Sequence, residues 1–155
     1  MIQRIQSIYF LLAGLAIFAL FLFPLAHNVY INGIASTVSV TGVSQDNGDQ
    51  QAQVQSFTAL IAGTAIAGIL PLALIFLYKN RKQQIAFGYS YIFVVIAYTY
   101  WQVQTVKSVV DINTFKTSNF GIGVLLSSIS IVLTLLAVKA IQRDEKLIKS
   151  ADRLR

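Results

Sequence analysis

The chain alternates between long apolar runs and shorter polar segments. Four runs, which contain no Asp, Glu, Lys, Arg or His, cover residues 5–23, 57–78, 85–101 and 121–138. A helix needs about 20 apolar residues to cross the hydrocarbon core of a bilayer, which is roughly 30 Å thick. The pattern therefore predicts an all-α membrane protein, with residues 1–155 forming a single domain of four transmembrane helices.

The longest polar segment, residues 24–56, predicts a small β element outside the membrane. Its Asn32-Gly33 pair lies between apolar and aromatic residues, which is the strongest short-range signal for a hairpin. Residues 36–40 alternate polar and apolar positions, as a half-buried strand does. We expect a mobile turn at residues 45–51 and a third short strand from residues 109–115, with a disordered loop as the alternative.

Composition and charge support this class of protein. Hydrophobic residues make up 55% of the chain and charged residues 12%, whereas soluble domains carry about 25% charged residues. The net charge is +6 at pH 7, but ten of the twelve Lys and Arg residues precede the first run, separate the second from the third or follow the fourth. The positive-inside rule then puts both termini in the cytoplasm, so the excess of positive charge requires no nucleic acid partner.

The most specific chemistry lies in the tail, residues 139–155, which we expect to continue the fourth helix as an amphipathic cytoplasmic helix. Leu147, Ala151 and Leu154 follow the helical i, i+4, i+7 spacing. The helix either lies on the anionic cytoplasmic leaflet or docks a protein, and its mixed charges favour the protein. The expected partner-binding residues are Arg4, Asp144, Glu145, Leu147, Ile148, Ala151, Asp152, Arg153 and Leu154.

No motif points to catalysis, so we expect no enzyme, no cofactor and no metal. There is no Cys, and the single His, His27, has no neighbouring carboxylate cluster with which to bind a metal. No ionisable group lies within an apolar run, whereas proton-coupled transporters place such groups inside their helices. Tyr89 and Tyr91, within the third run, either bond to Ser or Thr residues of the fourth run or line a ligand pocket.

The two ends of the chain resemble those of a known family. The opening MIQRIQSIY and the closing DEKLIKSADRLR are similar to the MIQRIQS-like start and DEKLxxSADRLR-like end of small four-helix inner-membrane proteins from Bacteroidota, a domain of unknown function. The resemblance covers the whole chain and implies a bacterial inner membrane and cytoplasmic termini, but no activity. It also implies that Gln3, Arg4 and Gln6 meet the tail near the inner interface.

Together these observations predict a non-catalytic accessory or scaffold subunit of the inner membrane, which docks a partner through its cytoplasmic C-terminal helix. Its expected partners are membrane lipids and a membrane or cytoplasmic protein complex. The alternative is a transporter or channel component that binds a lipid or small molecule in a pocket near Tyr89 and Tyr91.

Overall fold

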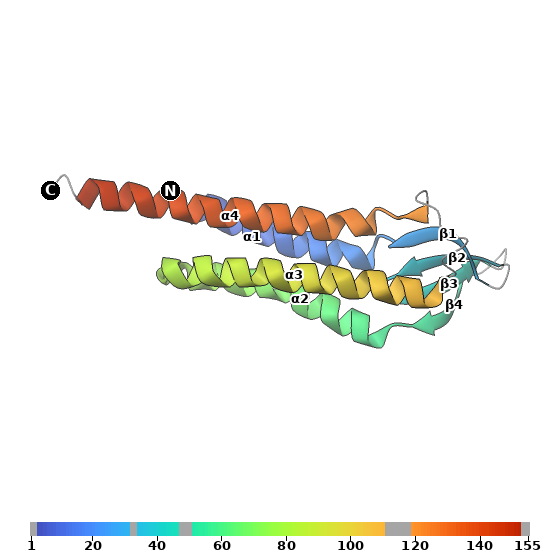
Figure 1. Ribbon diagram of the computed structural model, residues 1–155. Helices are drawn as coiled ribbons and strands as arrows, with labels where there is room; N and C mark the ends of the chain where they lie inside the picture. The colour runs from blue at the N-terminus through green and yellow to red at the C-terminus, as the bar shows by residue number, and fades with distance from the viewer. Residues whose placement is uncertain (1–2, 32–33, 47–50, 111–118, 153–155) are drawn as a thin grey trace.

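The molecule is a bundle of helices with a small sheet at one end (Figure 1). The computed structural model describes residues 3–31, 34–46, 51–110 and 119–152. The helices are α1 (Gln3–Phe18), α2 (Thr58–Phe76), α3 (Arg81–Val109) and α4 (Gly123–Asp152), with short 3-10 turns η1 (Ala19–Phe21) and η2 (Leu77–Lys79). The far end of α4 projects beyond the other helices, on the side opposite the sheet (Figure 1).

The sheet is an antiparallel meander in the order β1-β2-β3-β4. Its strands are β1 (Ala26–Ile31), β2 (Ile34–Ser39), β3 (Gly42–Asp46) and β4 (Gln51–Ser56). Ile31 pairs with Ile34, which confirms the hairpin expected around Asn32-Gly33, although those two residues lie outside the described part of the chain. Gly42 has φ +149°, and a Cβ there would lie 2.0 Å from the Gln55 carbonyl oxygen, so the sharp entry into β3 requires glycine.

Two sequence expectations about the β element fall mostly on residues outside the described part of the chain. At the edges of the mobile turn expected at residues 45–51, Gln45 and Asp46 lie in a strand and pair with Ala52 and Gln51; residues 47–50 are not described. Of the third strand expected at residues 109–115, Val109 is instead the last residue of α3, and residues 111–115 are not described. The third and fourth strands come from within the first long polar segment, because the turn at Gly42 brings the chain straight back beside β2.

The expectation of an all-α protein with four transmembrane helices is also wrong. Within the described ranges, two helices are long and apolar enough to cross a bilayer, Thr58–Lys79 and Gly123–Ile148. The apolar helix Ile5–Phe21 is shorter. The helix α3 is long, but tyrosine, serine, threonine and glutamine residues interrupt its apolar stretch. The fold is therefore mostly helical, with a four-stranded antiparallel sheet and two helices of membrane-spanning length and composition.

The core runs the length of the bundle and continues under the sheet. Helix α1 packs against α2 and α4, and α3 packs against α2 and α4. Phe10 and Ile17 of α1 and Leu20 of η1 are fully buried, and Val38 and Val40 extend the same core at the sheet end. The core side chains alternate along β2 and repeat at helical spacing along α1, as elements with one buried face require.

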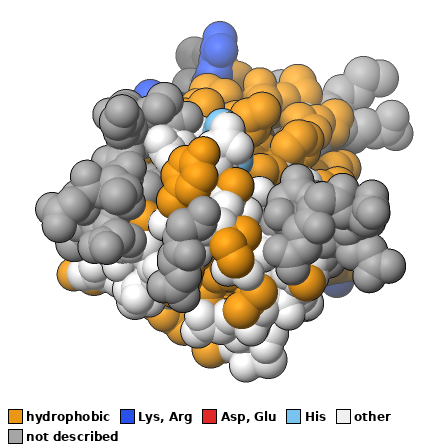
Figure 2. All heavy atoms as spheres, turned by 90° about the vertical axis from the view of Figure 1, so that its right-hand side faces the viewer, with side chains coloured by type: hydrophobic (Ala, Val, Ile, Leu, Met, Phe, Trp, Pro, Cys, Tyr) orange, Lys and Arg blue, Asp and Glu red, His pale blue; other side chains and the backbone are white. Residues whose placement is uncertain are grey.

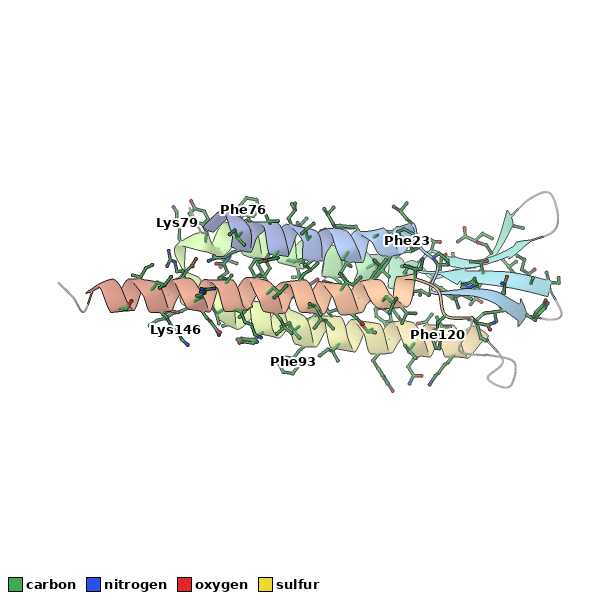
Figure 3. All side chains as sticks on the ribbon, turned by 90° about the horizontal axis from the view of Figure 1, so that it is seen from above. Phe23, Phe76, Lys79, Phe93, Phe120 and Lys146 are labelled. Atoms are coloured by element: carbon green, nitrogen blue, oxygen red, sulfur yellow. The ribbon has the colours of Figure 1, made fainter. Side chains whose placement is uncertain are left out.

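Three small residues of α2 lie inside the bundle. Thr64, Ala67 and Gly68 are buried, so the close packing that small residues permit occurs between helices of the same chain. Large apolar side chains cover the outside instead. Figure 3 shows Phe76 and Phe93 pointing away from the bundle, and they are 80% and 73% exposed. Figure 2 looks onto the sheet end, where hydrophobic and uncharged polar side chains cover most of the described surface.

Candidate functional site: the basic end of the bundle

Positive side chains gather at the end of the bundle opposite the sheet. Figure 3 places Lys79 and Lys146 there, far from Phe23 and Phe120 near the sheet. Among the described side chains, the exposed basic residues of this end are Lys79, Lys82, Lys139, Arg143 and Lys146, and Arg81 is half-buried. They come from η2, from the start of α3 and from the second half of α4. We call this region the basic end.

Two buried glutamines form hydrogen bonds between helices at the basic end. The Gln84 Nε2 atom of α3 donates a hydrogen bond to the Leu74 carbonyl oxygen of α2, at 2.9 Å. The Gln6 Nε2 atom of α1 donates to the Asp144 Oδ2 atom of α4. Gln6 and Asp144 are 6% and 8% exposed. Because an unpaired buried amide or carboxyl group is costly, each bond fixes how its two helices meet.

The Gln6–Asp144 bond changes the role that the sequence suggested for Asp144. The expected contact between the start of the chain and the tail is present at Gln6. Asp144, however, is buried and hydrogen-bonded to Gln6, so its carboxylate is not accessible to a partner. The side chains of Gln3 and Arg4, the other two residues expected to meet the tail, lie outside the described part of the chain.

Two of the partner-binding candidates in the tail are exposed apolar residues. Leu147 and Ile148 are 54% and 46% exposed, and Glu145 is half-buried. Nothing is described for the side chains of Ala151 and Asp152, nor for residues 153–155. Among the described side chains at the end of α4, Leu147 and Ile148 thus form an exposed apolar pair, and Arg143 and Lys146 are exposed in the same part of the helix.

Of the two alternatives for Tyr89 and Tyr91, a bond to Ser or Thr of the fourth run or a ligand pocket, the structure shows the first for Tyr91. The Tyr91 hydroxyl lies 3.2 Å from the Ser130 Oγ atom, and Ser130 Oγ donates to the Ala13 carbonyl oxygen at 3.0 Å. Ser130 has one proton, so Tyr91 must be the donor in their bond. Tyr91 is 3% exposed, and the chain of bonds joins α1, α3 and α4. The Tyr89 hydroxyl accepts a hydrogen bond from Gln142 Nε2 at 3.1 Å.

A cavity of about 160 Å³ lies at the other end of α3, near the sheet. Its walls come from one face of the last turns of α3, from Leu25 and from Phe120 and Val124 at the start of α4. The lining is mostly apolar, with Lys107 and Gln102 as its long polar side chains. Within the described residues no three His, Asp or Glu side chains gather as metal ligands would.

Gln102 is the polar group that sequence reasoning missed. Its side chain is 3% exposed, and its Oε1 atom accepts a hydrogen bond from Ser127 Oγ at 3.2 Å. The Gln102 side chain is also hydrogen-bonded to the Tyr98 side chain, in a bond too strained to meet strict geometry at Gln102 Nε2. The sequence signal was weak, because Gln102 follows the apolar run and falls where an exposed interfacial residue is expected.

Sequence comparison assigns the chain to a family. Residues 2–154 match the family described as Domain of unknown function (DUF4293). The chain belongs to this family. Comparison with curated proteins and with solved structures finds no match. The family description names no activity, so a function must be argued from the site and its chemistry.

Proposed function

We propose that the protein is a non-catalytic accessory or scaffold subunit of the bacterial inner membrane, and that it docks a partner protein through the end of α4. The observation that carries the proposal is the exposed pair Leu147 and Ile148 on a helix that projects beyond the bundle. An exposed apolar pair on a projecting helix is the kind of anchor that helix-in-groove recognition uses.

Membrane location is supported by the outer surface of the helices. Leu15 of α1, Ile66 of α2 and Leu125 of α4 are 53%, 61% and 61% exposed. Helices that are apolar outside as well as inside are typical of membrane proteins, and α2 and α4 have the length and composition to span. The positive-inside rule favours the basic end, where α1 begins and α4 ends, as the cytoplasmic end.

The course of α4 favours a protein partner over a lipid surface. An interfacial helix lies in the plane of the membrane, whereas α4 is one continuous helix from Gly123 to Asp152 that keeps to the bundle axis (Figure 1). At 1.5 Å per residue, Ile148 lies about 14 Å beyond Lys139, the first basic residue of this helix end. The helix therefore places Leu147 and Ile148 outside the lipid. The buried Gln6–Asp144 hydrogen bond keeps this part of α4 aligned with the bundle.

The proposal is tested by changing the apolar pair and the charges separately. Leu147→Gln with Ile148→Gln keeps the helix but removes the apolar surface, and co-purification of the native partner in mild detergent should fall more than ten-fold. Arg143→Gln with Lys146→Gln removes two exposed charges and should lower lipid attraction while keeping most of the partner. Quantitative mass spectrometry of the purified samples measures how much partner is recovered with each of the two variants.

A photo-crosslinking amino acid at position 147 provides an independent readout. It should form adducts with one recurrent protein, whereas the same group at position 129, an exposed isoleucine in the apolar part of α4, should react with lipid. Lipid adducts alone at position 147, together with an unchanged partner yield from the Leu147 and Ile148 variant, would refute docking through this surface.

A further inference from the structure

A row of cationic and amide side chains on α4 lies beside α3 at the basic end. Lys139, Gln142 and Lys146 follow the i, i+3, i+7 spacing, which places them on one face of the helix. Gln142 Nε2 donates a hydrogen bond to the Tyr89 hydroxyl of α3 at 3.1 Å, so this face borders the line where the two helices meet. We call Lys139, Gln142 and Lys146 the basic row.

The Tyr89 hydroxyl adds a further donor to the basic row. A Cβ built on Gly88 would lie 2.5 Å from the Val138 Cγ2 atom, so the absence of a side chain on Gly88 lets α4 pack directly against α3 here. Tyr89 and Lys139 are the next residues along the two helices, and both are exposed. Because Gln142 uses only a lone pair of the Tyr89 oxygen, the hydroxyl proton remains available to an acceptor outside the protein.

The basic row contains no acidic residue, and the acidic residues next to it interact within the protein. Asp144 is buried and hydrogen-bonded to Gln6. Glu145 is half-buried and also has an interaction partner in the structure. An anion at the basic row would therefore meet two positive charges together with amide and hydroxyl donors, which is the environment that favours a phosphate group.

The basic row lies at the depth of lipid phosphates when α4 spans the membrane as proposed. Lys139 is the first charged residue after the apolar part of α4, and the polar zone of each leaflet is roughly 5–8 Å thick. Gln142 lies about 5 Å and Lys146 about 11 Å beyond Lys139 along the axis, and the long Lys146 side chain can reach back. Towards the apolar zone, Leu135 and Val132 continue the same face, and Val132 is 55% exposed.

We propose that the basic row and the Tyr89 hydroxyl bind the phosphate of an anionic phospholipid in the cytoplasmic leaflet, with an acyl chain along Leu135 and Val132. A headgroup of net negative charge complements the two lysines, whereas the ammonium group of phosphatidylethanolamine finds no carboxylate in the row. The order of apolar and basic residues along this face matches the order of chain and phosphate in a lipid beside the helix. The inference rests on the membrane location and orientation proposed above, and it is independent of docking by Leu147 and Ile148.

The first experiment uses the unaltered protein, so it does not depend on whether a variant folds. Delipidated protein in detergent is titrated with dioleoyl phosphatidylglycerol and, separately, with dioleoyl phosphatidylethanolamine, which has the same acyl chains. Native mass spectrometry should show about ten-fold tighter binding of phosphatidylglycerol, because only its headgroup carries a net negative charge. Equal binding of the two lipids would overturn the proposal.

Charge variants separate a defined site from general attraction to a positive end. Lys139→Gln should weaken the binding of phosphatidylglycerol about five-fold. Lys79→Gln is the matched control, because it removes one exposed charge from the same end but on the opposite side from Lys146 (Figure 3). This control should bind phosphatidylglycerol as the unaltered protein does. Equal losses in the two variants would show that the lipid responds only to net charge, and would refute the site.

Two tyrosine variants test the hydroxyl. Tyr89→Phe should weaken phosphatidylglycerol about five-fold, because a hydrogen bond to the phosphate is lost. Tyr100→Phe is the matched control, since the exposed Tyr100 hydroxyl of the same helix also accepts a hydrogen bond from a glutamine, Gln104, at 2.6 Å, but lies eleven residues nearer the sheet end of α3. Equal affinities of the two variants would contradict a phosphate site at Tyr89.

A soluble competitor distinguishes a lipid from a free phosphate. Inorganic phosphate and glycerol 3-phosphate carry the phosphate group without acyl chains, so neither should displace phosphatidylglycerol at the same concentration. Displacement by either anion at that concentration would show that the chains contribute nothing, and would overturn the assignment to a lipid.

The two proposals fail separately. The Leu147→Gln and Ile148→Gln protein should keep its preference for phosphatidylglycerol, because the basic row is unchanged. Loss of the partner with intact lipid preference concerns only the docking surface. Absence of that preference in a protein that still captures its partner overturns only the lipid site.

Discussion

At the scale of residues, hydroxyl and amide groups decide how the helices meet. Thr64 Oγ1 donates to the Leu60 carbonyl oxygen at 2.7 Å, so the Tyr98 hydroxyl must donate to Thr64 where the two meet. Tyr98 thereby joins α3 to α2, as Gln6 joins α1 to Asp144 of α4. In lipid there is no hydrophobic drive for helices to associate, so such bonds and close packing set the arrangement.

The Gln6–Asp144 bond makes a prediction about stability. Asp144→Ala should lower the free energy of unfolding by about 1–3 kcal/mol, because the Gln6 amide is left buried without an acceptor. Asp144→Asn supplies an amide oxygen in the same place and should cost much less. Chemical unfolding in detergent micelles measures both. Asp144→Asn as unstable as Asp144→Ala would mean that the hydrogen bond is not the source of the stability.

At the scale of elements, the start of α4 is held by backbone hydrogen bonds to the segment between η1 and β1. The Gly121 amide donates to the Leu25 carbonyl oxygen at 2.8 Å, and the Gly123 amide donates to that of Pro24 at 3.0 Å. A single bridge pairs Ala26 with Phe120 next to these bonds. These contacts join the sheet to the bundle and shape one wall of the cavity, because Leu25 and Phe120 both line it.

This junction has no room for a side chain at position 121. A Cβ built on Gly121 would lie 2.1 Å from the Pro24 carbonyl oxygen, so Gly121→Ala forces two backbone segments apart. We expect a loss of about 2–3 kcal/mol in the free energy of unfolding. The neighbouring Ile122 is 60% exposed, and Ile122→Ala should change it by less than about 0.5 kcal/mol. Equal stabilities in a denaturant titration would contradict the tight junction.

At the scale of the whole molecule, the two ends of the bundle differ in chemistry. One end carries exposed basic side chains, among them Lys79 and Lys146 (Figure 3). The other end carries the sheet, and Lys107 is exposed near the end of α3 that faces it. A belt of exposed apolar side chains lies between the two ends. This three-zone surface is what the proposed orientation in a membrane requires, with the basic end in the cytoplasm.

The orientation is open to a labelling experiment, because the chain contains no cysteine. Single substitutions Ser44→Cys in β3, Ser128→Cys in the apolar part of α4 and Ser150→Cys near its end are treated with an impermeant maleimide. In cells with a permeabilised outer membrane, only position 44 should react; after lysis, position 150 should react as well. Position 128 is exposed and should stay protected, since lipid would cover it. Its rapid reaction would argue against membrane insertion.

The sequence alone determined the features that depend on neighbours in the chain. Charge-free apolar runs predicted where the helices lie, and α2 and α4 follow them closely. The Asn32-Gly33 pair predicted the β1–β2 hairpin, and the spacing of apolar residues predicted that α4 continues into the tail. These predictions succeed because apolar periodicity and turn chemistry act over a few residues and do not require knowledge of what lies opposite.

Only the tertiary structure decided which polar groups face one another. Gln6 and Asp144 are 138 positions apart, and nothing local in the sequence shows that the Asp144 carboxylate turns inward instead of towards a partner. Gln102 similarly becomes a buried partner of Ser127 only because α3 continues to Val109 and packs beside the start of α4. A buried hydrogen bond or a cavity wall is made by elements distant in the chain, so its existence depends on packing that the local pattern does not contain.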